Sequence, residues 1–325
     1  MSCQTISSPA TVINELSTFT GKTYAGCPIT RQTMHASGYA LPVTRSLIQA
    51  KILTDNFISG ETTRILDIGC FDGSLLLELD SILSKAELWG FDINPHLELY
   101  FPKKDNFYFM STDLEDIKSS FHLITMSHSI IYVPDLRILM ESINRLLLDD
   151  GTLFIQIPDI SSNPCYSLMG DQNFIFTKAS LTNVLKGFGY TSKVIDNNFF
   201  PRELLIAAQK NEPLNLPNDE DDNLFEQSIY KLNQVKEHIQ KIDHPNMAVL
   251  GTTVNAAFVD EILGERIQFF VDENTSSIGK DFRGKKVIHP KELGNSQHVI
   301  LPYGDSSIKI QERFQELYSG TYTIV

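Results

Sequence analysis

Hydrophobic positions follow two different periods along the first two thirds of the chain. Short apolar runs predict strands at 64–68, 87–91, 107–110, 122–126, 151–157, 192–197 and 203–208. Apolar residues three to four positions apart predict helices at 43–57, 75–83, 136–148 and 181–188. Strands that alternate with helices indicate an α/β fold built on a mostly parallel sheet flanked by helices. We therefore expect a Rossmann-like domain over residues 43–209.

The last third of the chain repeats the pattern on a smaller scale. Residues 210–223 are polar, acidic and proline-bearing, which is typical of a linker. An amphipathic helix is predicted at 224–242. Beyond it, the pattern predicts strands at 247–250, 267–271, 286–289 and 299–301, with helices at 254–263 and 308–318. We expect a second, smaller α/β Rossmann-like domain within residues 224–325.

Composition and charge narrow the class of protein. The 325 residues are 42% hydrophobic, a length and content that favour two globular domains. The 27 basic and 40 acidic residues give a net charge of −13, which disfavours nucleic acid as a partner. The four cysteines form no CxxC motif, so neither a zinc site nor a disulfide framework is predicted. The sequence shows neither a signal peptide nor a membrane span, and we expect a cytoplasmic protein.

One strand-turn-helix unit stands out as a candidate ligand site. The strand that ends at Ile68 is followed by Gly69, and Gly73 precedes the next helix. Glycines here let the backbone turn sharply and let a ligand approach it at the carboxyl edge of the sheet. A dinucleotide motif has a central glycine where this chain has Phe71, and Asp72 in the turn would oppose a pyrophosphate. Taken alone, the glycines are also compatible with a tight turn that binds nothing.

Carboxylates follow three successive predicted strands. Asp67 ends the first, Asp92 follows the second 25 positions later, and Asp113 follows the third. An acid near the position of Asp92 commonly meets ribose hydroxyls, and a carboxylate such as Asp113 can accept an adenine amino hydrogen. Asp67 suits a ligand with an ammonium or sulfonium charge. The three together predict a nucleoside site that also receives a cation.

These residues resemble the class I S-adenosylmethionine-dependent methyltransferases. The run from Asp67 to Gly73 resembles their first motif, with Phe71 in place of the usual middle glycine. Residues 123–135 resemble the fourth strand and the segment after it, and 146–153 resemble the turn before the fifth. The resemblance implies S-adenosyl-L-methionine as the cofactor. It implies a set of cofactor-binding residues comprising Asp67, Gly69, Cys70, Phe71, Gly73, Asp92, Ile93, Asp113, Leu114 and Ser127.

A narrower resemblance is to the sugar C-methyltransferases of deoxysugar biosynthesis. The 69–73 turn is similar to theirs, and residues 270–284 look like part of their C-terminal nucleotide-binding-like domain. This chain departs from the family at its catalytic segment, where Gln172 and Ile175 stand at the family's histidine and tyrosine. Neither side chain can abstract a proton near neutral pH. The resemblance therefore implies the architecture of the second domain and not the C-methylation mechanism.

Candidates for catalysis lie after the fourth strand. His128 has an imidazole suited to general-base work, and Ser127 beside it would face the methyl group. A purely structural histidine is the alternative. Tyr132, and His35 and Tyr39 in the irregular N-terminal segment 1–42, are weaker candidates, and that segment could serve as a lid.

The patterns together indicate an enzyme that methylates a small-molecule acceptor between its two domains. The acceptor could be a nucleotide-linked sugar or a natural-product intermediate. A non-catalytic protein that retains the nucleoside pocket and an NAD-dependent oxidoreductase are the alternatives. The acceptor atom stays open at this point.

Overall fold

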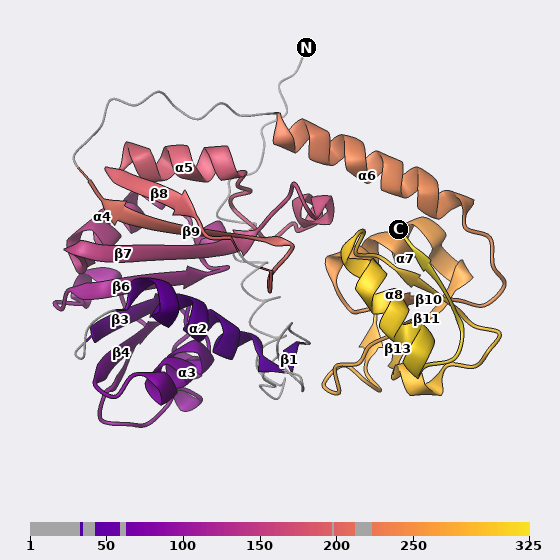
Figure 1. Cartoon of the computed structure of the whole chain (residues 1–325), viewed down its shortest axis with the longest axis horizontal. Coiled ribbons are helices and arrows are strands. Elements are labelled where there is room, and N and C mark those ends of the chain that lie inside the picture. Colours follow the sequence, from indigo (N-terminus) through magenta and orange to yellow (C-terminus); the bar gives the residue numbers. More distant parts are fainter. Residues whose placement is uncertain (1–32, 35–42, 59–62, 197, 212–222) are drawn as a thin grey trace, which may run out of the picture. The chain divides into compact units, whose positions relative to one another are not determined.

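The fold is built on two large β-sheets, and the short strands β1 (Thr33–Met34) and β2 (Val43–Thr44) pair in a third, two-stranded sheet (Figure 1). The computed structural model describes residues 33–34, 43–58, 63–196, 198–211 and 223–325. Within them, the first sheet has seven strands in the order β5-β4-β3-β6-β7-β9-β8. These strands are β3 (Thr63–Ile68), β4 (Ala86–Phe91), β5 (Phe107–Met110), β6 (Phe121–Ser127), β7 (Leu147–Pro158), β8 (Tyr190–Val194) and β9 (Glu203–Lys210).

The order of these strands creates a switch point between β3 and β6. The chain runs outward from β3 through β4 to β5, then returns to the other side of β3 at β6. All neighbouring strands are parallel except at β9, which is antiparallel to both β7 and β8. Open α/β sheets bind ligands outside the carboxyl ends of their strands at such a point. The register aligns Ile68 with Phe91, and Phe91 with Met110, so β3, β4 and β5 end level with one another.

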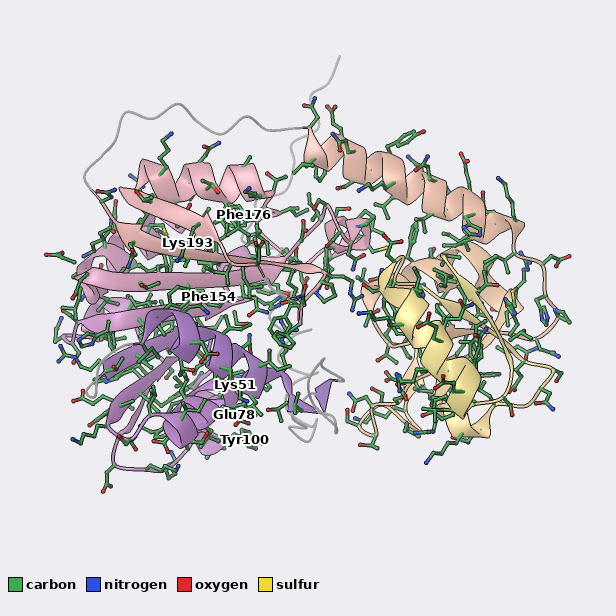
Figure 2. All side chains as sticks on the ribbon, in the orientation of Figure 1. Lys51, Glu78, Tyr100, Phe154, Phe176 and Lys193 are labelled. Atoms are coloured by element: carbon green, nitrogen blue, oxygen red, sulfur yellow. The ribbon has the colours of Figure 1, made fainter. Side chains whose placement is uncertain are left out.

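Helices cover both faces of the first sheet because successive strand residues point to opposite sides. On one face, Ile65, Leu123 and Phe154 pack against α2 (Arg45–Phe57) and α3 (Ser74–Ile82). On the other face, Leu66 and Ile124 pack against α4 (Leu136–Leu146) and α5 (Lys178–Gly187). Figure 2 labels one member of each core, Phe154 on β7 and Phe176 just before α5. The sheet is thus buried on both faces, and its edges and strand ends carry the polar chemistry.

The second sheet has the order β12-β13-β11-β10-β14-β15. Its strands are β10 (Met247–Leu250), β11 (Ile267–Val271), β12 (Asp281–Phe282), β13 (Lys285–Ile288), β14 (His298–Leu301) and β15 (Thr321–Ile324). All are parallel except β12, so the switch point lies between β10 and β14. The two helices of this α/β unit are α7 (Val254–Leu263) and α8 (Ser306–Leu317). This is a small Rossmann-like sheet, as the periodicity predicts.

Helix α6 (Leu224–Lys241) precedes the second sheet and is only half embedded. Ile239 is fully buried in the core beneath α7, and Val235 packs against the same core. At the other end of the helix, Phe225 and Ile229 remain 45% and 39% exposed. The apolar stripe predicted for this helix is therefore exposed at Phe225 and Ile229 and buried at Leu232 and Ile239.

The structure corrects some predicted boundaries. The helix predicted at 136–148 ends at Leu146, and Leu147 already pairs with Phe121 as the start of β7. The strand predicted at 192–197 spans 190–194, and β15 was not predicted at all. Most of the predicted 210–223 linker and nearly all of the predicted N-terminal lid, including His35 and Tyr39, lie outside the described residues. In the described part of the chain, no helix combines the length and apolarity that a membrane span requires.

Candidate cofactor and active site

The turn after β3 needs glycine at both of its ends. Gly69 has φ +82°, and a Cβ there would lie 2.4 Å from the Cβ of Ser129 in the segment after β6. Gly73 has φ +72° and precedes α3, and a Cβ there would lie 2.8 Å from Pro102 and 2.9 Å from Phe101. Positive φ and the lack of space exclude other residues at both positions. The turn is therefore pressed against the neighbouring segments at the switch point of the sheet.

Phe71 occupies the middle of this turn in a glycine-like conformation. Its φ is +50°, in the region that a bulky residue adopts only at a cost of about 1–2 kcal/mol. Its N–H donates to Oδ2 of Asp92 at 3.1 Å, and its side chain is 38% exposed. Asp72 is engaged locally, where Oδ1 accepts from the N–H of Ser74 at 3.0 Å at the start of α3. The departure from the usual middle glycine thus leaves the turn intact and adds an exposed aromatic ring to it.

Asp67 is the buried member of the three carboxylates. It is 3% exposed on β3 and accepts a 2.8 Å hydrogen bond from Oγ1 of Thr125 on β6. Burial raises the pKa of Asp67 to about 7, the negative charge of Asp92 adds to this rise, and the bond from Thr125 opposes it. Such a carboxyl group becomes ionised more readily when a cation arrives nearby.

Asp92 and Asp113 stand at the ends of the next two strands. Asp92 follows β4, where its two oxygens accept from the N–H groups of Phe71 and Asn94 at 3.1 and 3.0 Å. Asp113 is exposed and accepts from the N–H of Glu115 at 3.0 Å, at the start of a short 3-10 helix (Leu114–Asp116). No described residue forms an ion pair with Asp67, Asp92 or Asp113. The structure thus brings all three to one sheet edge, and none of them is neutralised by a described side chain.

The remaining predicted cofactor residues differ in how far their side chains are exposed to solvent. Ile93 is 85% exposed directly after Asp92, whereas Leu114 is 8% exposed and packs in the core of the domain. Cys70 is also buried, and burial raises the pKa of its thiol strongly. Ser127 ends β6, and its Oγ accepts from Nε2 of Gln49 at 2.8 Å. Of this group, Leu114 and Cys70 can offer a ligand mainly their backbone.

His128 sits in a polar cluster at the carboxyl ends of β6 and β7. Its φ is +58°, and its Nε2 lies 3.1 Å from Oε2 of Glu203 and 3.0 Å from a guanidinium nitrogen of Arg45. Arg45 also pairs directly with the same oxygen of Glu203. The amide of Gln156, which is fully buried, donates to that oxygen at 2.6 Å. Gln49 on α2 completes the cluster by donating to Oε1 of Gln156 at 2.9 Å.

The electrostatics of this cluster centre on Glu203. Burial by itself raises the pKa of this carboxyl, but hydrogen bonds from His128 and Arg45, and their charges, hold it at about 2. Glu203 is therefore ionised across the whole physiological range.

Arg45, Gln49, Gln156 and Glu203 are functional candidates that the sequence patterns do not predict. The sequence does carry one sign of this cluster, because Gln49 and Gln156 are amides inside apolar segments that pack in the core. Buried amides require partners, and such partners mark a polar cluster.

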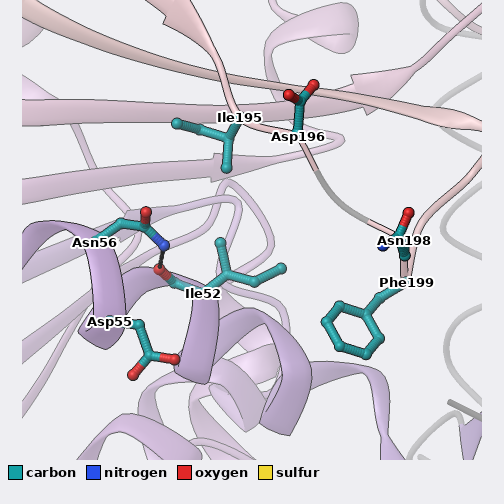
Figure 3. A pocket seen from close by; sticks show the side chains of 7 residues that line it. All are labelled: Ile52, Asp55, Asn56, Ile195, Asp196, Asn198 and Phe199. Carbon is teal, nitrogen blue, oxygen red and sulfur yellow. Dashed lines mark hydrogen bonds between the residues drawn. The ribbon is translucent and has the colours of Figure 1, made fainter. Parts of the chain in front are cut away.

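A pocket of about 320 Å³ lies elsewhere on the same domain (Figure 3). It is lined by Ile52, Asp55, Asn56, Ile195, Asp196, Asn198 and Phe199, from α2 and the segment after β8. In Figure 3 the amide of Asn56 turns back to the carbonyl of Ile52, a 2.8 Å bond. None of the predicted cofactor residues lines this pocket, so it does not belong to the switch-point site.

The corresponding turn of the second sheet is filled by protein groups. Gly251 follows β10 with φ +87°, and a Cβ there would lie 1.9 Å from the hydroxyl of Tyr303. That hydroxyl donates to the carbonyl of Leu250 at 3.2 Å. Thr252 donates to Asp272 at 3.1 Å. These contacts explain the glycine of this turn without any ligand.

One family model matches the first domain. Residues 43–195 match the family model described as "Methyltransferase domain". A search of the curated proteins finds no match. Among solved structures, the chain is similar to a putative methyltransferase in complex with the Trm112 activator from Haloferax volcanii, at 16% identity. That match covers 52% of this chain and 91% of the other, with a TM-score of 0.43.

Two further solved structures show similar values. The plantazolicin methyltransferase BpumL in complex with SAH is 14% identical, covering 51% of this chain and 82% of its own, with a TM-score of 0.42. A putative S-adenosylmethionine-dependent methyltransferase from Listeria monocytogenes is 14% identical, covering 51% and 98%, also with a TM-score of 0.42.

The matched residues coincide with the sheet whose strand ends carry Asp67, Asp92 and Asp113. The donor set fits an adenosyl sulfonium, with a glycine-bounded turn, one buried carboxyl and two accessible carboxylates at consecutive strand ends. Residues 43–195 thus match a methyltransferase domain and have a Rossmann-like fold.

Proposed function

We propose that the protein transfers a methyl group from S-adenosylmethionine to a small molecule whose accepting atom loses a proton. The observation that carries this proposal is the set of three carboxylates at one sheet edge, free of ion pairs with any described residue and next to the 69–73 turn. In this proposal Asp92 binds the ribose hydroxyls, and Asp113 with the backbone of Leu114 binds the adenine. Asp67 lies nearest the positive charge of the methionine portion. Ile93, with its 85% exposed side chain, covers the nucleoside.

For methyl transfer, the enzyme needs mainly to align the donor and the acceptor. When bound, the cofactor supplies an activated methyl group on a sulfonium, which is already a good leaving group. The chain's own residues hold the two reactants in line and exclude water. We propose His128 as the general base, because its imidazole stands after β6 at the switch point, beside Ser127.

The acceptor we propose is a nucleotide-linked sugar or a natural-product intermediate. The net charge of −13 disfavours a polyanionic acceptor such as nucleic acid, whereas a single small molecule can be held by a few local groups. The second Rossmann-like sheet supports an acceptor with a nucleotide portion, because such sheets bind nucleotides at their switch points. Tyr303, which fills the first turn of that sheet, limits how such a portion could approach it.

Titration calorimetry on the full chain tests the cofactor site. Wild type is expected to bind S-adenosylhomocysteine with one site per chain and to leave NAD unbound. Asp92→Ala is expected to lower the affinity by about 1.5–3 kcal/mol through lost hydrogen bonds to the ribose. The exposed Asp105 offers a matched control, and Asp105→Ala should bind as wild type does. Equal affinity of Asp92→Ala and wild type would show that the ribose lies elsewhere.

The acceptor class can be tested by transfer of label. Full-length protein with tritiated S-adenosylmethionine is offered nucleoside-diphosphate sugars in one set and hydroxylated aromatic compounds in another. Labelled product from either set supports a small-molecule acceptor. Label incorporated only into added protein or nucleic acid would contradict it.

A further inference from the structure

The contacts of His128 distinguish its two ring nitrogens. Nε2 points into the cluster, 3.1 Å from Oε2 of Glu203 and 3.0 Å from Arg45. No described residue forms a hydrogen bond with Nδ1. The side chain of His128 is 33% exposed, whereas that of Glu203 is 9% exposed. One nitrogen is therefore engaged by the protein, and the other is left for a ligand or solvent.

Two arrangements of the ring proton can be compared. If Nε2 carries the proton, it donates to Glu203, and Arg45 and Gln156 donate to the same oxygen. If Nε2 carries a lone pair, it can accept from Arg45, but that lone pair then lies 3.1 Å from an ionised carboxylate oxygen. Two acceptors at this distance repel one another, and the buried position of Glu203 strengthens the repulsion. The first arrangement leaves two donors, Nε2 and the Arg45 nitrogen, 3.0 Å apart, but both donate to the same ionised oxygen of Glu203. It is the favourable one because the buried carboxylate attracts both N–H groups, whereas the second arrangement sets a lone pair against that charge.

We propose that Glu203, held in place by Arg45 and Gln156, keeps the ring proton of His128 on Nε2 and so presents Nδ1 as the nitrogen that deprotonates the acceptor. This inference rests on the proposed function and adds Glu203 and Arg45 as positioning residues. Neither touches the acceptor, and both act through the orientation and charge of the imidazole.

The proton balance follows from this geometry. The acceptor's hydroxyl or amine forms a bond to the methyl carbon, and its proton passes to Nδ1 of His128. The electron pair of the broken sulfur–carbon bond stays on sulfur. His128 becomes an imidazolium, whose charge is stabilised by the carboxylate of Glu203. Release of the Nδ1 proton to solvent restores the starting state, since the ring is partly exposed.

The backbone at His128 agrees with a constrained ring. Its φ of +58° is uncommon for a residue with a side chain, and its N–H donates to the carbonyl of Gln156 at 2.8 Å. Gln156 thus binds Glu203 through its side chain and the backbone of His128 through its carbonyl. Strained backbone of this kind persists where the surroundings determine it, and it gathers at active sites.

Nitrogen-15 NMR on the full-length protein, labelled at histidine and mixed with S-adenosylhomocysteine, tests the proposal without an acceptor. In the neutral ring of His128, we expect the proton on Nε2, with an N–H signal protected from exchange, and an unprotonated Nδ1. Glu203→Ala should abolish the protected signal. Glu237→Ala, on the exposed side of α6, should leave it unchanged. A proton on Nδ1, or a protected signal that survives Glu203→Ala, would overturn the proposal.

A second variant separates orientation from charge and covers a failure of Glu203→Ala to fold. Glu203→Gln keeps an oxygen that can accept from Nε2 but removes the negative charge. It should keep the proton on Nε2 and lower kcat by about 100-fold, with KM for S-adenosylmethionine within a factor of two. The kinetic probe is the nucleoside-diphosphate sugar or hydroxylated aromatic compound that accepts label. A wild-type kcat in Glu203→Gln would overturn the proposed role of the charge.

The same samples separate this proposal from the proposed function. Binding of S-adenosylhomocysteine is measured by calorimetry and reports on Asp92 and the 69–73 turn, whereas the NMR signals report on Glu203 and His128. Normal binding together with a proton on Nδ1 would overturn the proposed role of Glu203 and leave the cofactor site standing.

Discussion

Replacement of Asp67 by asparagine is expected to stabilise the ligand-free protein at alkaline pH. The folded state holds this carboxyl at a pKa of about 7, against an ordinary value of 3.8. As the pH rises from about 4 to 7, the folded chain keeps a proton that the unfolded chain has already released. Stability therefore falls through this window, and the loss is complete above pH 7. The difference between the two pKa values corresponds to about 4 kcal/mol of unfolding free energy.

Asparagine removes this loss while it keeps an oxygen that can accept from Thr125. Asp67→Asn should thus match wild type near pH 4 and exceed it by up to about 4 kcal/mol at pH 8. For a domain of this size, such a difference raises Tm by on the order of 10 °C. Thermal unfolding followed by circular dichroism at both pH values measures the gap, and Asp105→Asn, at an exposed position, is the control.

The ligand reverses the advantage. A bound ammonium or sulfonium favours the ionised carboxylate, so S-adenosylhomocysteine should stabilise wild type more than Asp67→Asn at pH 8. Equal Tm values for the two proteins at pH 8 without ligand would refute the reasoning, because Asp67 would then be ionised in the folded state at no cost.

Three further changes test other parts of the structure. Gly69→Ala places a Cβ 2.4 Å from Ser129 at a φ of +82°. Chemical denaturation should therefore show an unfolding free energy lower by about 2–3 kcal/mol. Gly170→Ala is the control, and it should cost much less because no heavy atom lies within 4 Å of the added Cβ. Glu203, with its pKa held at about 2 against an ordinary 4.5, contributes about 3 kcal/mol that is present above pH 4.5 and lost as the pH falls toward 2. The unfolding free energy of Glu203→Gln should therefore fall less than that of wild type between pH 4.5 and 2. An equal fall in both proteins would show that other groups cause the acid destabilisation. Gly251→Ala places a Cβ 1.9 Å from the hydroxyl of Tyr303 and should cost at least about 2 kcal/mol, and a neutral result would mean that Tyr303 is free to move aside.

The features that the sequence predicts well are local ones. The strand that ends at Ile68, the turn bounded by Gly69 and Gly73, and the helix after it lie within about 20 consecutive residues. Their hydrophobic period and their glycines are sufficient to define them. Asp92 could be placed beside this turn because parallel strands of similar length end at the same edge. The expectation of a nucleoside site needed only these local patterns.

The polar cluster around His128 and Glu203 could not be predicted in the same way because its contacts are distant in sequence. Arg45 and Glu203 are 158 positions apart, and Glu203 and His128 are 75 apart. Nothing in the residues around Glu203 indicates a partner, since the five strand residues that follow it, 204–208, are all apolar. Only the antiparallel insertion of β9 beside β7 brings it to the carboxyl edge of the sheet.

Boundaries failed where one element runs directly into another. Leu147 and Leu148 continue the apolar period of α4, yet pairing of Leu147 with Phe121 draws them into β7. Tertiary pairing overrides local propensity at such a junction. The short strand β15 follows Gly320 and has only four residues, too few for a reliable period.

The most direct test of the central claim is a crystal structure of the full-length protein with S-adenosylhomocysteine. We expect the nucleoside at the carboxyl ends of β3 and β4, with its ribose hydroxyls about 3 Å from the carboxylate of Asp92. We also expect the adenine to lie beside Asp113 and the amino acid portion to approach Asp67. A nucleoside bound in the pocket between α2 and Phe199, or anywhere that leaves these three carboxylates without contact, would contradict it.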